Sequence, residues 1–165
     1  MMDSCAMLAA SRSDGGKGSD PKFLTDQESP EPLNPAPPVP TESRRLALET
    51  AAAFENEGFR IRDSEWQNSL SKGQSAFLQI CLFSGNQYWF VAASPTNAVK
   101  IRMVVYDPSG KPLKSDSWQD GGAHPGSRAA LGFAPTISGM YFVAVEFLDI
   151  PGGSPNDVCF VYAYK

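Results

Sequence analysis

Apolar and polar residues alternate in short runs over the last ninety residues of the chain, from Ala76 to Lys165. Such alternation puts successive side chains on opposite faces of a strand. Gly, Pro, Asn and Asp separate the runs at the spacing typical of sandwiches, and no helical pattern lies between them, so parallel strands are not expected. The fold class predicted is all-β, an antiparallel β-sandwich. Its strands are expected at 59–67, 76–83, 88–93, 100–106, 112–118, 128–134, 140–149 and 157–164.

One short helix is predicted ahead of these strands, from Glu42 to Glu57. Thr41 is its expected N-cap, and Gly58 its expected C-cap. The side that should dock on the body is formed by Ala47, Leu48, Ala51, Ala52 and Phe54.

The first 40 residues carry seven of the 14 prolines and few large apolar side chains. We expect them to form a disordered, Pro-rich tail, most simply a spacer, with Pro35 and Pro38 as the elements of a recognition ligand in the alternative reading. The predicted organisation is a tail over 1–40, a helix over 41–58 and a sandwich domain over 59–165.

Charge and composition narrow the classes of function. A net charge of −4 and a pI near 4.9 argue against nucleic-acid binding, which needs a basic surface. No stretch is apolar for long enough to span a membrane. Residues 1–10 lack a basic start and a long apolar run, so a signal peptide is not evident.

The three cysteines, Cys5, Cys81 and Cys159, are too few and too scattered for a zinc site. Cys81 and Cys159 fall in an early and in the last predicted strand. A disulfide between them is geometrically conceivable, but two small buried thiols are the preferred interpretation. Cys5 would be a free thiol, or a lipid-bearing residue if an upstream signal preceded it.

No catalytic residues are assigned. The only histidine, His124, lies in a Gly-rich loop and is followed by Pro125, and no Gly-x-Ser-x-Gly elbow occurs. A carboxylate pair such as Asp149 and Asp157 has no positive support. We therefore predict that the protein is not an enzyme, and a hydrolase is the least favoured function.

Connections between consecutive antiparallel strands alternate between the two ends of a sandwich. Short turns at 84–87, 107–111 and 135–139 should share one end, and longer polar loops at 68–75, 94–99, 119–127 and 150–156 the other. Recognition sites gather on such loops. The candidate binding residues at the loop-rich end are Asn97, Asp120, His124, Asn156 and Asp157, with Trp66 and Trp118 close by.

No cofactor and no metal site are assigned. Asp120, Asn156 and Asp157 supply the oxygen ligands that calcium prefers, so a calcium site is kept as a minor alternative. Six aromatic residues could instead form a stacking surface for sugar or collagen, although burial in the core is preferred. These are Trp66, Trp89, Trp118, Tyr88, Tyr162 and Tyr164.

Three phrases of the sequence succeed one another in order: Ser84-Gly85-Asn86-Gln87-Tyr88-Trp89-Phe90, Val104-Val105-Tyr106-Asp107-Pro108-Ser109-Gly110, and Pro135-Thr136-Ile137-Ser138-Gly139-Met140-Tyr141-Phe142-Val143. With them, residues 59–165 resemble the bacterial pre-peptidase C-terminal domains and the related collagen-binding domains. The resemblance implies a jelly-roll-like sandwich of about eight strands in an exported protein, secreted or periplasmic, that acts as a non-catalytic accessory or adhesion module.

The function expected is thus binding of a protein or polysaccharide outside the cytoplasm. The alternative is a structural subunit that docks through a sheet face or an edge strand. An exposed row of Tyr or Trp would favour sugar or collagen as the ligand, whereas a flat apolar sheet face would favour assembly with another protein.

Overall fold

A computed structural model describes residues 41–62, 65–113, 116–119 and 126–165. The predicted tail, with Cys5, lies outside these residues. The described part contains helix α1 (Glu42–Ala52), a short 3-10 turn η1 (Glu55–Glu57) and nine strands. The strands are β1 (Arg60–Ile61), β2 (Trp66–Leu70), β3 (Ser75–Leu82), β4 (Tyr88–Ser94), β5 (Lys100–Tyr106), β6 (Asp116–Gln119), β7 (Ser127–Phe133), β8 (Gly139–Asp149) and β9 (Asn156–Tyr164).

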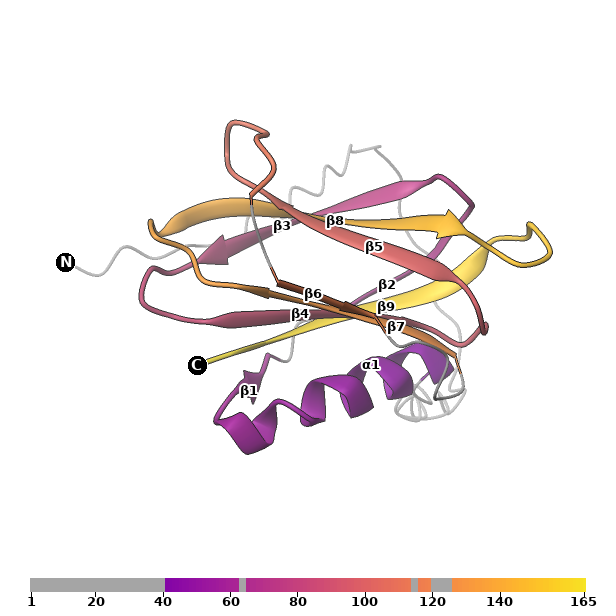
Figure 1. Ribbon diagram of the computed structural model, residues 1–165, viewed down its shortest axis with the longest axis horizontal. Helices are drawn as coiled ribbons and strands as arrows, with labels where there is room; N and C mark the ends of the chain where they lie inside the picture. Colours follow the sequence, from indigo (N-terminus) through magenta and orange to yellow (C-terminus); the bar gives the residue numbers. More distant parts are fainter. Residues whose placement is uncertain (1–40, 63–64, 114–115, 120–125) are drawn as a thin grey trace, which may run out of the picture. The chain divides into compact units, whose positions relative to one another are not determined.

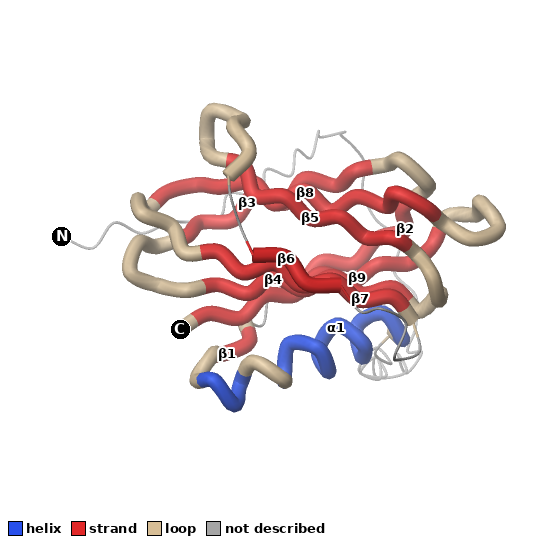
Figure 2. Tube along the Cα trace, in the orientation of Figure 1, coloured by secondary structure: helices blue, strands red, loops and turns tan. Residues whose placement is uncertain are grey.

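The nine strands form two antiparallel sheets that pack face to face, which confirms the predicted sandwich (Figure 1, Figure 2). The larger sheet has the order β1-β9-β4-β7-β6, and β2 also pairs with β9; the smaller sheet has the order β3-β8-β5. Among the described residues, no helix is long and apolar enough to cross a membrane.

Two predicted strands differ from the structure. The strand expected at 59–67 is divided into β1 and β2, which pair with opposite parts of the same neighbour, β9. Of the strand expected at 112–118, the structure describes β6 from Asp116 on. Pro112 makes only an isolated bridge to Tyr106, because it has no N–H to donate to a ladder, and residues 114–115 lie outside the described residues.

The core lies between the sheets and consists of the inward residues of both. Its largest side chains with almost no exposure include Phe90, Leu131, Phe147 and Ile101. The predicted inward faces of three strands are confirmed, for example Val105 in β5 and Val143 and Val145 in β8.

Helix α1 covers the outer side of the larger sheet, where it packs on β4, β9 and β7 (Figure 1). Its predicted N-cap is confirmed, since the Thr41 hydroxyl accepts a hydrogen bond from the Arg44 N–H at 3.3 Å. The predicted C-cap is wrong for α1: Ala53 occupies that position, and Gly58, with φ +87°, caps the following turn η1 instead. The helix itself ends at Ala52, earlier than predicted.

The docking side of α1 was predicted only in part. Ala47 and Ala51 are buried as expected, but Ala52 is exposed, and Leu46 is buried in its place. Thr50 is buried too, because its hydroxyl donates to the Leu46 carbonyl at 2.8 Å and is thereby satisfied within the helix.

The two strand cysteines are not neighbours. Cys159 is a free, buried thiol in β9, on the side that faces α1. Cys81 is half-buried and lies in β3, which belongs to the other sheet. Cys159 therefore makes no disulfide with Cys81, and the prediction of a buried thiol is confirmed for Cys159 only.

Candidate functional site

The connections between strands sort to the two ends of the sandwich as predicted. At the tight-turn end, the Ser84 N–H donates to the Ser138 hydroxyl at 2.8 Å, which joins two of the short turns. At the loop-rich end, the Ser127 hydroxyl donates to the Thr96 carbonyl at 2.9 Å, and Lys72 pairs with Asp149 at 2.9 Å. The predicted polar loops therefore lie together.

The predicted binding residues of that end have structural hydrogen bonds. Asn97 accepts from the Gly126 N–H, and Asn156 both accepts from the Thr96 hydroxyl and donates to the Ser154 carbonyl at 2.9 Å. Asp157 is exposed and opposite Ser69 of β2. Asp120 and His124 lie outside the described residues.

The structure does not bring Trp66 and Trp118 together. Trp66 is opposite Phe160 of β9, and its half-buried ring packs against the core between the sheets. Trp118 is 45% exposed on edge strand β6, opposite Ala130, which faces α1. The two indole rings thus point to opposite sides of the larger sheet.

Most of the other aromatic candidates for a stacking surface are part of the protein interior. Tyr88 is 4% exposed, and Tyr162 and Tyr164 pack beside it against the core. The Trp89 ring is stacked on Phe54 at 4.5 Å between centroids, so η1 and the end of α1 partly cover it. These positions leave no exposed row of Tyr or Trp among the described residues.

A metal site also finds no support in the described part of the chain, where no three His, Cys, Asp or Glu side chains are grouped. Asp120, one of the three oxygen ligands considered for calcium, lies outside that part.

The feature that distinguishes this sandwich is the outer face of its smaller sheet. The side chains that alternate with the core residues of β3, β8 and β5 point away from the larger sheet. We call the largely apolar part of this side the outer face: Phe77, Gln79, Cys81, Val104, Tyr106, Met140, Phe142 and Ala144. Toward the other end of the strands the same side carries polar and charged residues, namely Ser75, Lys100, Arg102 and Glu146.

The outer face is a continuous surface, because its residues are cross-strand neighbours. Phe77 is opposite Ala144, and Ala144 is opposite Val104 in the next strand. The Phe77 and Tyr106 rings, from the two edge strands, lie 6.2 Å apart between centroids. Phe77 is nevertheless 64% exposed and Met140 37% exposed, so the described residues leave much of this face open to solvent.

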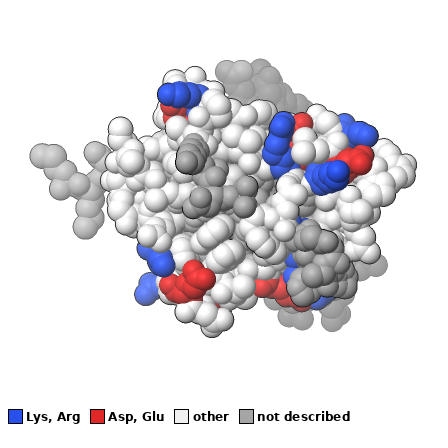
Figure 3. Space-filling view, in the orientation of Figure 1, with Lys and Arg blue, Asp and Glu red and all other residues white. Residues whose placement is uncertain are grey.

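Charged groups lie at one boundary of the outer face and are paired there. The Arg102 guanidinium donates to the Glu146 carboxylate at 2.9 Å, and the two residues are opposite each other in the sheet. Beyond them, Lys72 pairs with Asp149. In the view of Figure 3, the charged side chains of the described residues are gathered in a few separate groups.

These residues were not predicted as a site, although the sequence contains a signal for them. In the segment from Ala76 to Leu82, both alternating sets are largely apolar: Ala76, Leu78, Ile80 and Leu82 on one side, and Phe77 and Cys81 on the other. A strand that is apolar on both faces is typical of one that is covered on both faces.

Comparison with known proteins finds no family model that matches the chain and no curated protein that matches it. The fold of the described residues alone defines the class of the protein, an all-β sandwich with one helix. The resemblance to pre-peptidase C-terminal domains stays a prediction.

Proposed function

We propose that the protein is a non-catalytic binding module that docks another protein through the outer face of β3, β8 and β5. The observation that carries this proposal is an apolar sheet face that no described element covers. An exposed aromatic row would favour sugar binding, and an apolar sheet face would favour assembly with another protein. The described residues form an apolar sheet face and no such row.

The larger sheet indicates what kind of element fits such a face. Its own outer side is buried beneath α1, with Leu46, Ala47 and Ala51 packed on Val91 and Val161. A sheet with two apolar faces needs a layer on each of them. The smaller sheet has one such layer, the core, and an amphipathic helix of the partner protein would supply the other.

The size of the outer face agrees with a helix. Three strands about 4.8 Å apart, each with about seven residues rising about 3.3 Å, form a surface of roughly 15 Å by 20 Å. A helix about 10 Å wide and about 15 residues long covers such a surface. The face and the helix together would bury about 600 Å², well below the about 1,200 Å² typical of a stable interface.

The same estimate favours a weak contact over a stable dimer of this chain. About 600 Å² of apolar burial gives about 15 kcal/mol, and association itself costs about 4 to 15 kcal/mol. Among its described residues, a second copy offers a flat sheet with edge strands and no amphipathic helix that is free to dock, because α1 is already packed on the larger sheet.

The location outside the cytoplasm, secreted or periplasmic, is part of the proposal and rests on the sequence resemblance alone.

The test uses the full chain labelled with ¹⁵N and two peptides of about 15 residues. One peptide carries leucines on one helical side and uncharged polar residues elsewhere; the other has the same composition in scrambled order. We expect the first peptide to shift amide signals of β3, β5 and β8, and the scrambled peptide to leave them unchanged. Phe77→Lys and Val104→Lys should abolish the shifts, while the control Trp118→Lys, an exposed aromatic on the other sheet, should not.

Three outcomes would refute the proposal. The first is the absence of shifts on the three strands at millimolar peptide. The second is concentration-dependent dimerisation, in sedimentation velocity, that Phe77→Lys removes, since it would assign the face to a second copy. The third is binding to a glycan panel that Phe77→Lys does not weaken while the peptide is inert, which would place the binding function on another surface.

A further inference from the structure

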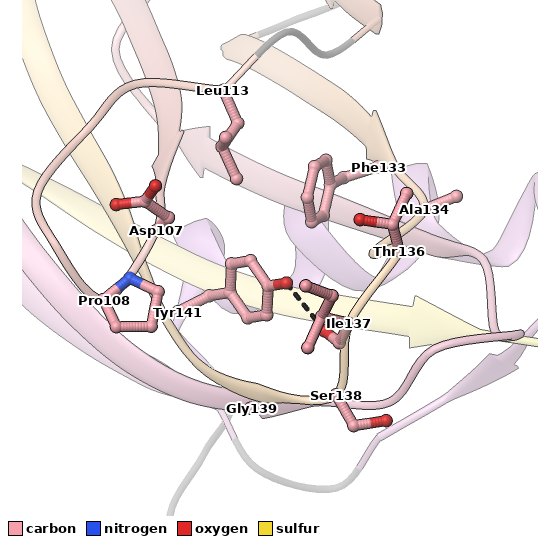
Figure 4. A pocket seen from close by; sticks show the side chains of 10 residues that line it. All are labelled: Asp107, Pro108, Leu113, Phe133, Ala134, Thr136, Ile137, Ser138, Gly139 and Tyr141. Carbon is pink, nitrogen blue, oxygen red and sulfur yellow. Dashed lines mark hydrogen bonds between the residues drawn. The ribbon is translucent and has the colours of Figure 1, made fainter.

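A pocket of about 510 Å³ opens at the tight-turn end of the sandwich, away from both the outer face and the predicted loop site (Figure 4). It lies where the turn after β5 meets the connection between β7 and β8. Its size is within the range of about 300 to 1,000 Å³ of small-molecule sites. From the sequence, only short turns were predicted at this end.

The wall of the pocket is mainly apolar and aromatic. Leu113, Phe133 and Tyr141 line it together with the exposed Ile137. The Phe133 and Tyr141 rings meet edge to face at 5.6 Å between centroids. The Tyr141 hydroxyl donates to the Ile137 carbonyl at 2.7 Å, which holds the ring in place and satisfies its polar end (Figure 4).

Among the described residues, one charged residue lines the pocket, and it is an acid. Figure 4 shows Asp107 on one side, with Phe133 and Thr136 on the opposite side. One carboxylate oxygen of Asp107 accepts from the Ser109 hydroxyl at 2.6 Å and from the backbone N–H groups of Ser109 and Lys111 at 2.9 and 3.0 Å. These bonds fix the carboxylate within its own turn and use only one of its two oxygens.

The same contacts keep the group ionised. The hydrogen bond from the Ser109 hydroxyl, followed by that from the Lys111 N–H, holds the pKa of Asp107 below its ordinary value of 3.8. The Lys111 ammonium acts on Asp107 in the same direction, more weakly. Because no Lys or Arg is among the described residues that line it, this part of the pocket combines a negative charge with two aromatic rings.

We propose that this pocket binds a small organic cation with an apolar body, the Asp107 carboxylate facing its ammonium group and the Phe133 and Tyr141 rings contacting the rest. Ring faces and carboxylates both attract an ammonium ion, and the rings also accept the apolar part. The Asp107 carboxylate would repel an anion of the same shape. The site is independent of the outer face, because it uses the opposite side of β8 and the turns at its end.

The test compares three probes of one shape: 3-phenylpropylammonium, 3-phenylpropan-1-ol and 3-phenylpropionate. Each is titrated into the full chain at pH 7 and constant ionic strength, and the Phe133 and Tyr141 ring signals are followed by NMR. Ligands with about ten non-hydrogen atoms should bind in the millimolar range. The ammonium probe should bind roughly three to ten times more tightly than the alcohol, and the carboxylate most weakly.

Two substitutions separate the charge from the cavity. Asp107→Asn keeps an oxygen for the turn and should reduce the ammonium-to-alcohol ratio to about one, whereas Asp149→Asn, at the other end of β8, should leave the ratio unchanged. Ala134→Trp, at an exposed position of the wall, should block all three probes. Equal binding of the three probes, a ratio that survives Asp107→Asn, or shifts that do not saturate would overturn the proposal.

Discussion

If the outer face serves binding, its residues contribute little to folding, and a matched pair of substitutions measures this. Leu46 and Phe77 are large apolar residues that lie at the outer sides of the two sheets. Leu46 belongs to α1, packs on the outer side of the larger sheet and is 1% exposed, whereas Phe77 belongs to β3 and is 64% exposed. We compare Leu46→Ala with Phe77→Ala in the free energy of unfolding.

The expected magnitudes follow from these exposures. Truncating a fully buried leucine removes its transfer energy and leaves a cavity, so Leu46→Ala should cost about 2 to 5 kcal/mol. Full burial of a phenylalanine is worth about 1.5 to 3 kcal/mol, and only about a third of Phe77 is buried. Phe77→Ala should therefore cost about 0.5 to 1 kcal/mol.

Equilibrium unfolding in urea at pH 7, followed by far-UV circular dichroism, gives both values. With a slope of about 2 kcal/mol per M, the two midpoints should differ by about 0.5 M or more at equal slope. A cost for Phe77→Ala as large as that for Leu46→Ala would show that another part of the chain covers Phe77. The outer face would then be interior, and the docking proposal would fail.

Further tests address the scaffold. Gly126 and Gly152 have nearly equal φ of +81° and +82°, but a Cβ at Gly126 would lie 2.6 Å from the Ser94 carbonyl oxygen, whereas a Cβ at Gly152 would contact nothing within 4 Å. In the same urea assay, Gly152→Ala should therefore lower the free energy of unfolding by about 1 to 2 kcal/mol, and Gly126→Ala should lower it clearly more. Thr41→Ala should cost about 1 kcal/mol through loss of the α1 N-cap, and no change would contradict the capping role. Burial raises the pKa of the Cys159 thiol from its ordinary 9.0 to about 12. Its contribution to stability is therefore complete below pH 9 and lost between pH 9 and about 12, a loss that Cys159→Ala should reduce; an identical alkaline decline in this variant would refute the assignment.

The strands could be predicted from the sequence because each apolar set repeats every second residue and each turn has its own chemistry. Val143, Val145 and Phe147 form one such set, and they are interior as predicted. The alternation also predicted which connections share an end. It could not predict that the segment at 59–67 forms two short strands, because β1 and β2 are separated by their pairing with β9 and not by a change in periodicity.

The candidate sites could not be derived in the same way, for two physical reasons. Polarity in a loop does not distinguish a residue that binds a ligand from one that holds the loop, and Asn97 and Asn156 do the second. The pocket depends on residues far apart in the sequence, such as Asp107 and Phe133, which come together only when the sheets are packed. The docking side of α1 shifted for a similar reason, since Leu46 gains its burial from β4 and β9.

The outer sides of the two sheets carry different side chains, and that difference connects the fold to the proposed function. The outer side of the larger sheet carries small residues, Ala93 and Ala130 among them, which let α1 approach closely. The outer face of the smaller sheet carries rings instead, with Ala144 alone small and central between Phe77 and Val104. The Phe77 and Tyr106 rings lie 6.2 Å apart between centroids, and Ala144 is only 6% exposed. The two rings therefore meet over the middle strand, and a helix of a partner would lie on top of them.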